Sequence, residues 1–376
     1  MIYLDYSANT PINKEVLESF NKVVLNYPAN PNSLHGLGVK AKELIDASTK
    51  QIASILNVKE NEIIYTSDSS EANNLALKGI AYKYKNRGMH IITTELEHSS
   101  IYGPLNFLSS QGFIVDFVKL NEDGTIDLDD LKNLLKEDTI LVSINAVNSE
   151  IGILQPIDKI GKVIKENSKA FFHSDITQAV GKIKVDLTNV DLASFTAHKF
   201  FGINGIGCLI KKDKIMLEPL IHGGKSTTIY RSGTPYLPLI VSMAKALRLA
   251  YDKIDEKYNK VLELNNYLKE GLKQYKNVYI NSLDTSIPHI LNFSVVGVKP
   301  ETLVHALEKD EIYISTQSAC ASSNSFSKSV LGLTGNMDRA KSSVRVSIAH
   351  ITTKDEIDKF LSCFDKCYKE LNHDKN

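Results

Sequence analysis

The sequence predicts an α/β protein with a large domain built on a mainly parallel, helix-covered sheet, followed by a smaller α+β domain. Short apolar runs alternate with amphipathic stretches through the first two-thirds of the chain, as in crossover units that build a parallel sheet. Several runs are apolar on both faces, which is typical of strands buried between two helical layers. The chain has 376 residues, more than a single core usually supports. We therefore expect a large domain over residues 14–253 and a small domain made of residues 1–13 with 254–376.

Seven short apolar runs are the candidate strands of the large domain. They span residues 62–66, 90–94, 114–118, 140–144, 170–173, 192–196 and 206–210. Runs of this length, bounded by polar residues, are typical of buried strands. An amphipathic helix is predicted over about 39–56, because Leu44, Ile52 and Ile55 share one stripe of a 3.6-residue repeat.

The pattern changes at about residue 237, where a long helical region begins and continues to about residue 275. Few strands follow, of which 289–295 is the clearest. Thr353-Lys354-Asp355-Glu356 forms a capping box, in which the threonine and glutamate side chains accept from each other's backbone N–H groups. This box predicts the start of a final helix.

The charge balance of the chain excludes several classes of partner. Lys and Arg total 44, and so do Asp and Glu, which gives a formal net charge of zero. Such a chain has no global field that attracts nucleic acid or an anionic membrane. No apolar run approaches the roughly 18–20 residues of a membrane span, and residues 1–5 lack the charged and apolar regions of a secretion signal. We therefore expect a cytoplasmic protein.

The four cysteines, Cys208, Cys320, Cys363 and Cys367, are too few and too scattered for a disulfide framework. Cys363 and Cys367 could share one helix face, but no further ligand lies near them in sequence, so no metal site is expected. Cys320 lies in the segment 315–329, where seven of fifteen positions are serine. Because so polar a segment cannot bury much surface, it predicts a mobile loop that leaves the Cys320 thiol accessible.

Polar residues follow several predicted strands directly, and in open α/β sheets ligands bind at the carboxyl ends of strands. Ser69 and Ser70 follow the first strand and open a helix. Hydroxyls and free amides at a helix N-terminus can hold a phosphate. The alternative is ordinary helix capping by Asp68 with Glu71, which is the commoner use of such residues.

Three more strand ends carry residues that could bind a cofactor or take part in catalysis. Asp175 could keep the pyridine nitrogen of a cofactor protonated, although a capping aspartate is the ordinary interpretation. Lys199 follows the buried strand 192–196, where desolvation would favour the neutral amine and Schiff-base chemistry; a surface lysine with a buried stem is the alternative. His98 could stack on a cofactor ring and move protons, but a lone histidine is more often structural.

Eight segments in this chain resemble the cysteine desulfurases of the class V aminotransferase family, in the order in which that family carries them. The segments are 3–11 (Tyr-Leu-Asp-Tyr-Ser-Ala-Asn-Thr-Pro), 97–98 (Glu-His), 148–152 (Asn-Ser-Glu-Ile-Gly), 175–178 (Asp-Ile-Thr-Gln), 198–199 (His-Lys), 231–234 (Arg-Ser-Gly-Thr), 318–320 (Ser-Ala-Cys) and 344–347 (Val-Arg-Val-Ser). They extend over essentially the whole chain, so the resemblance implies the fold type I of enzymes that use pyridoxal 5'-phosphate (PLP).

The resemblance also implies roles for individual residues. Lys199 would bind PLP covalently and move the α-proton of the substrate, and His98 would stack on the ring. Cys320 would take sulfur from L-cysteine as a persulfide, leaving L-alanine. The residues implied to bind PLP are Ser69, Ser70, His98, Ser149, Asp175, Gln178, Thr196, His198, Lys199 and Thr234, the last from the second subunit of a homodimer. Arg345 and Asn148 would bind the substrate, and a sulfur-acceptor protein such as an iron–sulfur scaffold would receive the persulfide sulfur.

The chain departs from the family pattern at several positions. The family's glycine in the phosphate turn is Asp68 here, its threonine is Ser70, and the second asparagine of Asn-Asn-Glu is Ser149. The glycine-rich segment after 222 continues as Lys225-Ser226-Thr227. A carboxylate near a phosphate predicts weaker PLP retention unless Asp68 caps the helix instead. Two other interpretations stay open: a selenocysteine lyase or other class V enzyme, and a weakened relative that mainly binds proteins.

Overall fold

A seven-stranded sheet forms the centre of the computed structural model, which describes residues 1–316 and 326–373. Across the sheet the strands follow the order β2 (Ile63–Thr66), β8 (Gly207–Lys211), β7 (Leu192–Thr196), β6 (Phe171–Asp175), β5 (Thr139–Ser143), β3 (His90–Thr93) and β4 (Ile114–Phe117). Strand β8 is antiparallel to both of its neighbours, and all other neighbouring pairs are parallel. The predicted α/β class with a mainly parallel sheet is confirmed.

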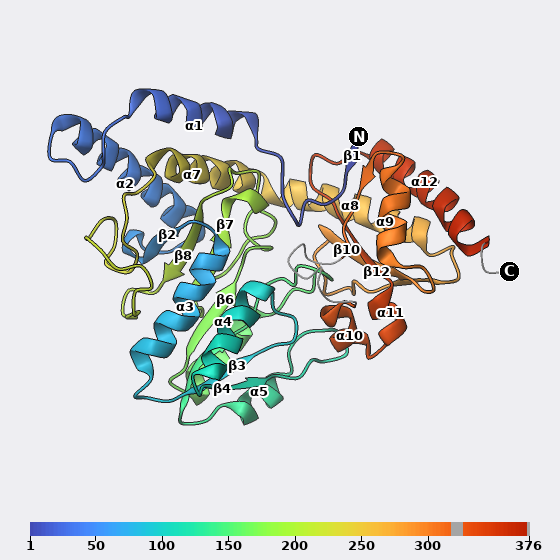
Figure 1. The fold of residues 1–376 in the computed structure, drawn as a ribbon, viewed down its shortest axis with the longest axis horizontal. Helices are drawn as coiled ribbons and strands as arrows, with labels where there is room; N and C mark the ends of the chain where they lie inside the picture. The colour runs from blue at the N-terminus through green and yellow to red at the C-terminus, as the bar shows by residue number, and fades with distance from the viewer. Residues whose placement is uncertain (317–325, 374–376) are drawn as a thin grey trace.

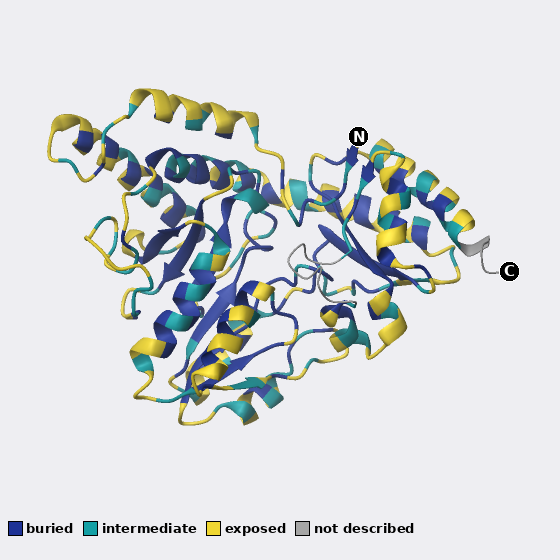
Figure 2. Cartoon of the chain, in the orientation of Figure 1, coloured by how far each residue is buried: buried dark blue, intermediate teal, exposed yellow. Residues whose placement is uncertain are grey.

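Helices cover both faces of this sheet, as Figure 1 shows. One face packs against α2 (Gly36–Leu56), α5 (Leu128–Leu134), α6 (Ile157–Asn167) and α7 (Leu237–Tyr251), with α1 (Lys14–Asn26) lying on α7, and the other face packs against α3 (Ser69–Tyr84) and α4 (Ser99–Ser110). Successive strand residues alternate between the two cores; in β2, for example, Ile63 and Tyr65 join one core and Ile64 the other. Because both faces are covered, the strands from β2 to β3 are almost wholly buried and form the dark blue centre of Figure 2, whereas the edge strand β4 is exposed or half-buried.

A second core lies beside the sheet. It is built on the antiparallel strands β9 (Val278–Ile280), β10 (Ile290–Val295) and β12 (Ser343–Ser347), with helices α8 (Ile254–Leu272), α9 (Pro300–Glu308) and α12 (Lys354–His373). The chain start joins this core, since β1 (Ile2–Tyr3) pairs with β11 (Ile312–Tyr313) and Leu4 is fully buried there. We propose these two units as the large and small domains, with the boundaries expected from the sequence.

The helical region expected from about 237 to 275 is present as two helices, α7 and α8, which Lys253 separates by adopting a left-handed conformation with φ of 51°. One sequence expectation needs correction. The serine-rich segment is not exposed over its whole length: Ser327 and Ser329 are buried where α10 (Lys328–Thr334) begins, and Ser327 caps that helix. Residues 317–325 of the segment, Cys320 among them, lie outside the described residues.

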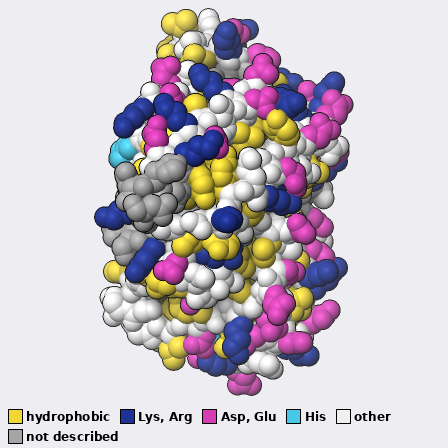
Figure 3. Space-filling view, turned by 90° about the vertical axis from the view of Figure 1, so that its right-hand side faces the viewer, with side chains coloured by type: hydrophobic (Ala, Val, Ile, Leu, Met, Phe, Trp, Pro, Cys, Tyr) yellow, Lys and Arg dark blue, Asp and Glu magenta, His cyan; other side chains and the backbone are white. Residues whose placement is uncertain are grey.

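The remaining short elements are the 3-10 helices η1 (Glu60–Glu62) and η2 (Ala197–Lys199) and the helix α11 (Met337–Lys341). The capping box before α12 is confirmed, since Thr353 N donates to Glu356 Oε2 at 2.8 Å and Glu356 N donates to Thr353 Oγ1 at 3.3 Å. On the face shown in Figure 3, acidic, basic and apolar side chains are interspersed. No helix in the described part of the chain combines the length and the apolar character needed to cross a membrane.

Candidate active site

A cavity of about 260 Å³ lies where the polar strand ends meet the small unit. Its wall is formed by Ser7, Ala8, Asp68, Ser69, Ser70, His98, Asn145, Val147, Ser149, Asp175, Thr177, Gln178, His198, Lys199 and Arg345. Asp175 ends β6, Lys199 ends the short turn after β7, and His98 caps the helix after β3. The site expected at the carboxyl ends of the strands is therefore one continuous cavity.

One end of the cavity is the N-terminus of α3. Asp68 Oδ1 accepts from Glu71 N at 2.9 Å, so Asp68 caps this helix, as the ordinary interpretation expected. Ser69 and Ser70 are the first helical residues and line the cavity. A Cβ built on Gly207 would lie 2.4 Å from the carbonyl carbon of Asp68, so only glycine lets β8 approach this turn. The result is a close-packed helix N-terminus with two hydroxyls, which suits a phosphate.

His198 lies beside this end, and Thr196 positions it. Thr196 Oγ1 bonds His198 Nδ1 at 3.1 Å and donates to the carbonyl of Ile206 at 3.0 Å. Thr196 is fully buried and is not part of the cavity wall, so its side chain orients His198 and does not face the cavity. Burial, with the neighbouring Lys199, lowers the pKa of His198 to about 4. The imidazole is therefore neutral near pH 7.

Asp175 lies deeper in the cavity and is held from two sides. Its Oδ2 accepts from Asn73 Nδ2 at 2.8 Å, and its Oδ1 accepts from Thr177 N at 2.9 Å. Asn73 Nδ2 also bonds Ser100 Oγ at 2.9 Å, and Ser100 Oγ bonds His98 Nδ1 at 2.9 Å. A single network thus fixes the carboxylate and the imidazole relative to each other. Burial lowers the pKa of His98 despite the nearby carboxylate of Asp175.

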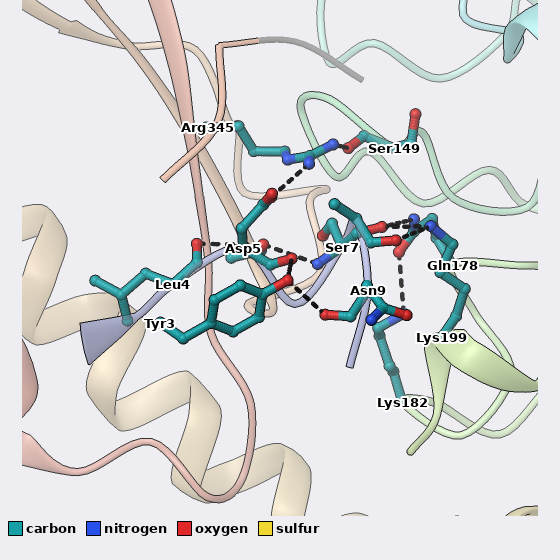
Figure 4. Close-up of polar contacts among 12 residues, drawn as sticks. Tyr3, Leu4, Asp5, Ser7, Asn9, Ser149, Gln178, Lys182, Lys199 and Arg345 are labelled. Atoms are coloured by element: carbon teal, nitrogen blue, oxygen red, sulfur yellow. Dashed lines mark hydrogen bonds and ion pairs between the residues drawn. The ribbon is translucent and has the colours of Figure 1, made fainter. Parts of the chain in front are cut away.

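Lys199, at the end of η2, lines the cavity and contacts the N-terminal segment (Figure 4). Its Nζ donates to the carbonyls of Ser7 at 2.8 Å and Ala8 at 2.7 Å. Gln178 Nε2 donates to the same Ser7 carbonyl at 3.0 Å, and Lys182 Nζ donates to Gln178 Oε1 at 3.0 Å. The N-terminal segment therefore supplies acceptors that hold the lysine and the glutamine of the cavity.

Arg345 on β12 is the cation of the small-unit wall. Its Nη1 donates to the Ser149 carbonyl at 2.9 Å, and its Nη2 pairs with Asp5 Oδ1 at 2.7 Å (Figure 4). The side chain is only 1% exposed, and Nε has no hydrogen-bond partner among the described residues. A buried, unsatisfied guanidinium donor in a cavity wall is a ready partner for a ligand carboxylate.

Three described residues expected in the site do not line the cavity: Thr196, Asn148 and Thr234. Asn148 is buried and does not line the wall, because its Nδ2 donates to the Leu96 carbonyl and its Oδ1 accepts from Glu150 N and Ile151 N. Its amide builds the turn, and the substrate contact expected of Asn148 stays a prediction. Thr234 is exposed on the loop before α7, and it is absent from this wall. Cys320 lies outside the described residues.

The described cysteines are poor nucleophiles. Burial raises the pKa of Cys208, which lies fully inside β8. Burial also raises the pKa values of Cys363 and Cys367 on α12, to which nearby carboxylates contribute. Thiols that resist ionisation are unreactive. None of these three residues lines the cavity.

The residues present fit PLP, a phosphate ester of a pyridine aldehyde. The cavity offers a helix N-terminus with Ser69 and Ser70 for a phosphate, the oriented carboxylate of Asp175 for a ring nitrogen, and the amine of Lys199 for an aldehyde. Sequence reasoning missed several contributors, among them Ser7, Ala8, Asn73 and Lys182. Ser7 and Ala8 act through backbone carbonyls, so no side-chain signal marks them, whereas Asn73 had one, an asparagine on the buried face of the helix that begins at Ser69.

Comparison with known proteins places this site in a family. Residues 2–360 match the family model of aminotransferase class V, which includes every described residue of the cavity wall. The chain belongs to the class V aminotransferase family. Among curated class V relatives, the protein named cysteine desulfurase IscS from Dictyoglomus turgidum is 36% identical, with 98% of this chain and 95% of the relative covered. The protein of the same name from Buchnera aphidicola subsp. Acyrthosiphon pisum is 42% identical over 95% and 90%.

Solved class V structures agree with this assignment. A NifS-like protein superimposes with a TM-score of 0.92 at 32% identity, covering 99% of each chain. A structure described as SspA in complex with cysteine superimposes with a TM-score of 0.82 at 30% identity, covering 94% of this chain and all of that one. The family and the fold expected from the sequence motifs are therefore confirmed.

Proposed function

We propose that this class V enzyme is a PLP-dependent cysteine desulfurase, which converts L-cysteine to L-alanine and keeps the sulfur as a persulfide on Cys320. The observation that carries the proposal is the meeting of an amine, an oriented carboxylate and a buried guanidinium in one cavity. The relatives named as cysteine desulfurases, at 36–42% identity over nearly their full lengths, support the choice of reaction.

The proposed cofactor residues act on separate parts of PLP. Ser69, Ser70 and His198 would hold the phosphate, Asp175 would keep the ring nitrogen protonated, and His98 would lie against the ring. Gln178 and Ser149 would bond the ring oxygen, and Thr196 would act through His198. Bound PLP supplies an electron sink for the bonds at the substrate α-carbon.

Substrate binding and proton transfer fall to residues on opposite walls. Arg345 binds the substrate carboxylate through the guanidinium donors that Asp5 and Ser149 leave available. Lys199 removes the proton from the substrate α-carbon, and the neutral His98 is suited to accept or return protons near it. Both walls are needed to hold the substrate, because a substrate bound only through its carboxylate at Arg345 could still rotate about that contact.

Sulfur transfer is assigned to Cys320. Its thiolate attacks the sulfur of the bound cysteine, forming an S–S bond while the substrate Cβ–S bond breaks. The electron pair of the broken bond stays with the substrate carbon, which takes up a proton and leaves as alanine. The persulfide sulfur then passes to an acceptor protein, which we propose to be an iron–sulfur scaffold.

We also propose a homodimer in the cytoplasm, in which Thr234 reaches the phosphate of the second subunit. The exposed position of Thr234, outside the wall of its own cavity, supports this role.

The proposal is tested by incubating the PLP-loaded enzyme with L-cysteine and a reductant while alanine and sulfide are measured together. We expect equal amounts of both products from the native chain. Cys320→Ala should still bind PLP but make neither product, and Cys363→Ala is the matched control that should behave as the native chain. Intact-protein mass after cysteine treatment without reductant locates the sulfur. An added sulfur that persists in Cys320→Ala would show that another residue is the acceptor.

A further inference from the structure

Lys182 is a buried amine next to the cavity that the proposed mechanism does not use. Lys182 lies four residues after Gln178 and is 7% exposed. Its Nζ donates to Gln178 Oε1 at 3.0 Å. Among the described residues no ion pair includes Lys182, and the charged groups that act on it are the cations Lys199 and Arg345.

Burying an amine without a carboxylate is costly, and an apolar side chain would avoid that cost. Burial and the two neighbouring cations lower the pKa of Lys182 to about 7. The amine of Lys182 is therefore kept at a position where both its desolvation and the repulsion from Lys199 and Arg345 disfavour its charged form. The bond from its Nζ to the Gln178 amide is the contact with the described residues that a methionine or leucine could not reproduce.

That bond fixes which end of the Gln178 amide faces which neighbour. While Lys182 is protonated, its ammonium group has donors only, so the atom of Gln178 that faces it is then the amide oxygen, as the Nζ–Oε1 bond at 3.0 Å shows. At the other end the Ser7 carbonyl accepts only, so the atom facing it must be the amide nitrogen, at 3.0 Å. Gln178 lines the cavity, and its Nε2 has a second hydrogen beyond the one given to Ser7.

We propose that Lys182 is a positioning residue that holds the Gln178 amide with its N–H, not its oxygen, toward the ring oxygen of PLP. This inference rests on the proposed function, because it assigns a polarity to a contact with that cofactor. An N–H directed at the ring oxygen stabilises the deprotonated, negatively charged form of that oxygen. An amide free to rotate would present its own oxygen part of the time and lose that stabilisation.

The experiment is a pH titration of the absorbance band of bound PLP, together with the dissociation constant of PLP, in a graded series at position 182. Lys182→Arg keeps donors only, Lys182→Gln can donate or accept, and Lys182→Met can do neither. We expect the midpoint of the band to stay near the native value in the arginine variant and to rise by about one pH unit in the methionine variant. The glutamine variant should lie between them, and it carries the test if the methionine variant does not fold.

Two controls separate positioning from a structural effect. Lys211 is another buried lysine, on β8, whose Nζ donates to the Ile215 carbonyl at 2.7 Å and which does not line the cavity. Lys211→Met should lower the unfolding temperature but leave the band midpoint unchanged. In a Gln178→Ala background, Lys182→Met should no longer move the midpoint, because the residue through which it acts is gone.

The outcomes separate this inference from the proposed function. If the native chain binds PLP and makes alanine but the midpoint is the same across the position-182 series, the inference is wrong and the function stands. A midpoint shift that persists in the Gln178→Ala background would also overturn it, since Lys182 would then act without the amide. Failure of the native chain to bind PLP would overturn both.

Discussion

The two walls of the cavity are built in different ways. On the sheet wall, Asp175 ends a strand of the seven-stranded sheet, and His98 and Lys199 follow two other strands of it. On the small-unit wall, Arg345 stands on β12 and is held by Asp5, 340 positions away in sequence, and by the backbone of residue 149. The sheet wall is therefore positioned by one rigid element, and the small-unit wall by three segments that must meet correctly.

The N-terminal segment connects these two walls. Toward the small unit, Ser7 N donates to Ser347 Oγ at 2.9 Å and Ser347 N donates to the Leu4 carbonyl at 2.7 Å. Toward the sheet wall, Thr10 N donates to the His198 carbonyl at 3.0 Å. The placement of Arg345 relative to Lys199 thus depends on the N-terminal segment, which is part of neither β12 nor η2. The comparison predicts that changes on the sheet wall affect the cofactor, whereas changes on the small-unit wall affect the substrate.

The largest effect is expected at Lys199, the residue of the sheet wall that we propose binds PLP covalently. Lys199→Ala should leave no PLP attached to the protein after borohydride reduction, and desulfurase activity should fall by roughly 10²–10⁴-fold or more. The exposed Lys184, replaced in the same way, is the control and should keep both properties. Covalent attachment that survives in Lys199→Ala would assign the wrong lysine.

Arg345 tests the opposite wall. Arg345→Lys keeps a positive charge but loses the planar fork that binds a carboxylate through two N–H groups. We expect the KM for cysteine to rise by roughly 10–100-fold, with PLP affinity nearly unchanged. Arg339 of the same unit, which donates to Asn281 Oδ1 and the Ile280 carbonyl, is the matched control. Equal losses of PLP and of cysteine binding in Arg345→Lys would contradict the division between the walls.

Asp5 should give a smaller effect of the same kind. Asp5→Asn keeps the shape of the side chain but removes the charge that pairs with Arg345 at 2.7 Å. We expect the KM for cysteine to rise by roughly 3–10-fold and the unfolding temperature to fall, because the buried guanidinium loses its counter-charge. A lower KM in steady-state kinetics would instead mean that Asp5 competes with the substrate for Arg345.

The smallest effect is expected at Asp68, at the phosphate end of the sheet wall. Asp68→Gly removes the cap of α3, which should cost about a few tenths of a kcal/mol in unfolding free energy. It also removes a carboxylate beside the proposed phosphate site, so PLP should bind a few-fold more tightly. Asp127 caps α5 away from the cavity through Asp129 N and Asp130 N, which makes Asp127→Gly the control for the loss of a cap. Tighter binding in both variants, or in neither, would argue against a role for the charge of Asp68.

The sequence by itself determined the sheet and the wall that depends on it. The candidate strands are present in the structure with small shifts at their ends, because runs that are apolar on both faces must be covered by helices on both sides. Once the strands are parallel, their carboxyl ends share one edge, so Asp175 and Lys199 lie in one cavity without any knowledge of long-range contacts. The capping box before α12 was equally readable, because it is local.

Only the tertiary structure decided the contacts between distant segments. The pairing of Asp5 with Arg345, the carbonyls of Ser7 and Ala8 at Lys199, and the bond from Lys182 to Gln178 have no sequence signature. Asn148 shows the same limit, since its type suits a substrate contact but its amide bonds Glu150 N in its own turn and the carbonyl of Leu96, 52 positions away. The physical reason is that a hydrogen-bonding group gives no local indication of its partner: backbone carbonyls occur at every residue, and packing alone selects which of them a buried amine can reach.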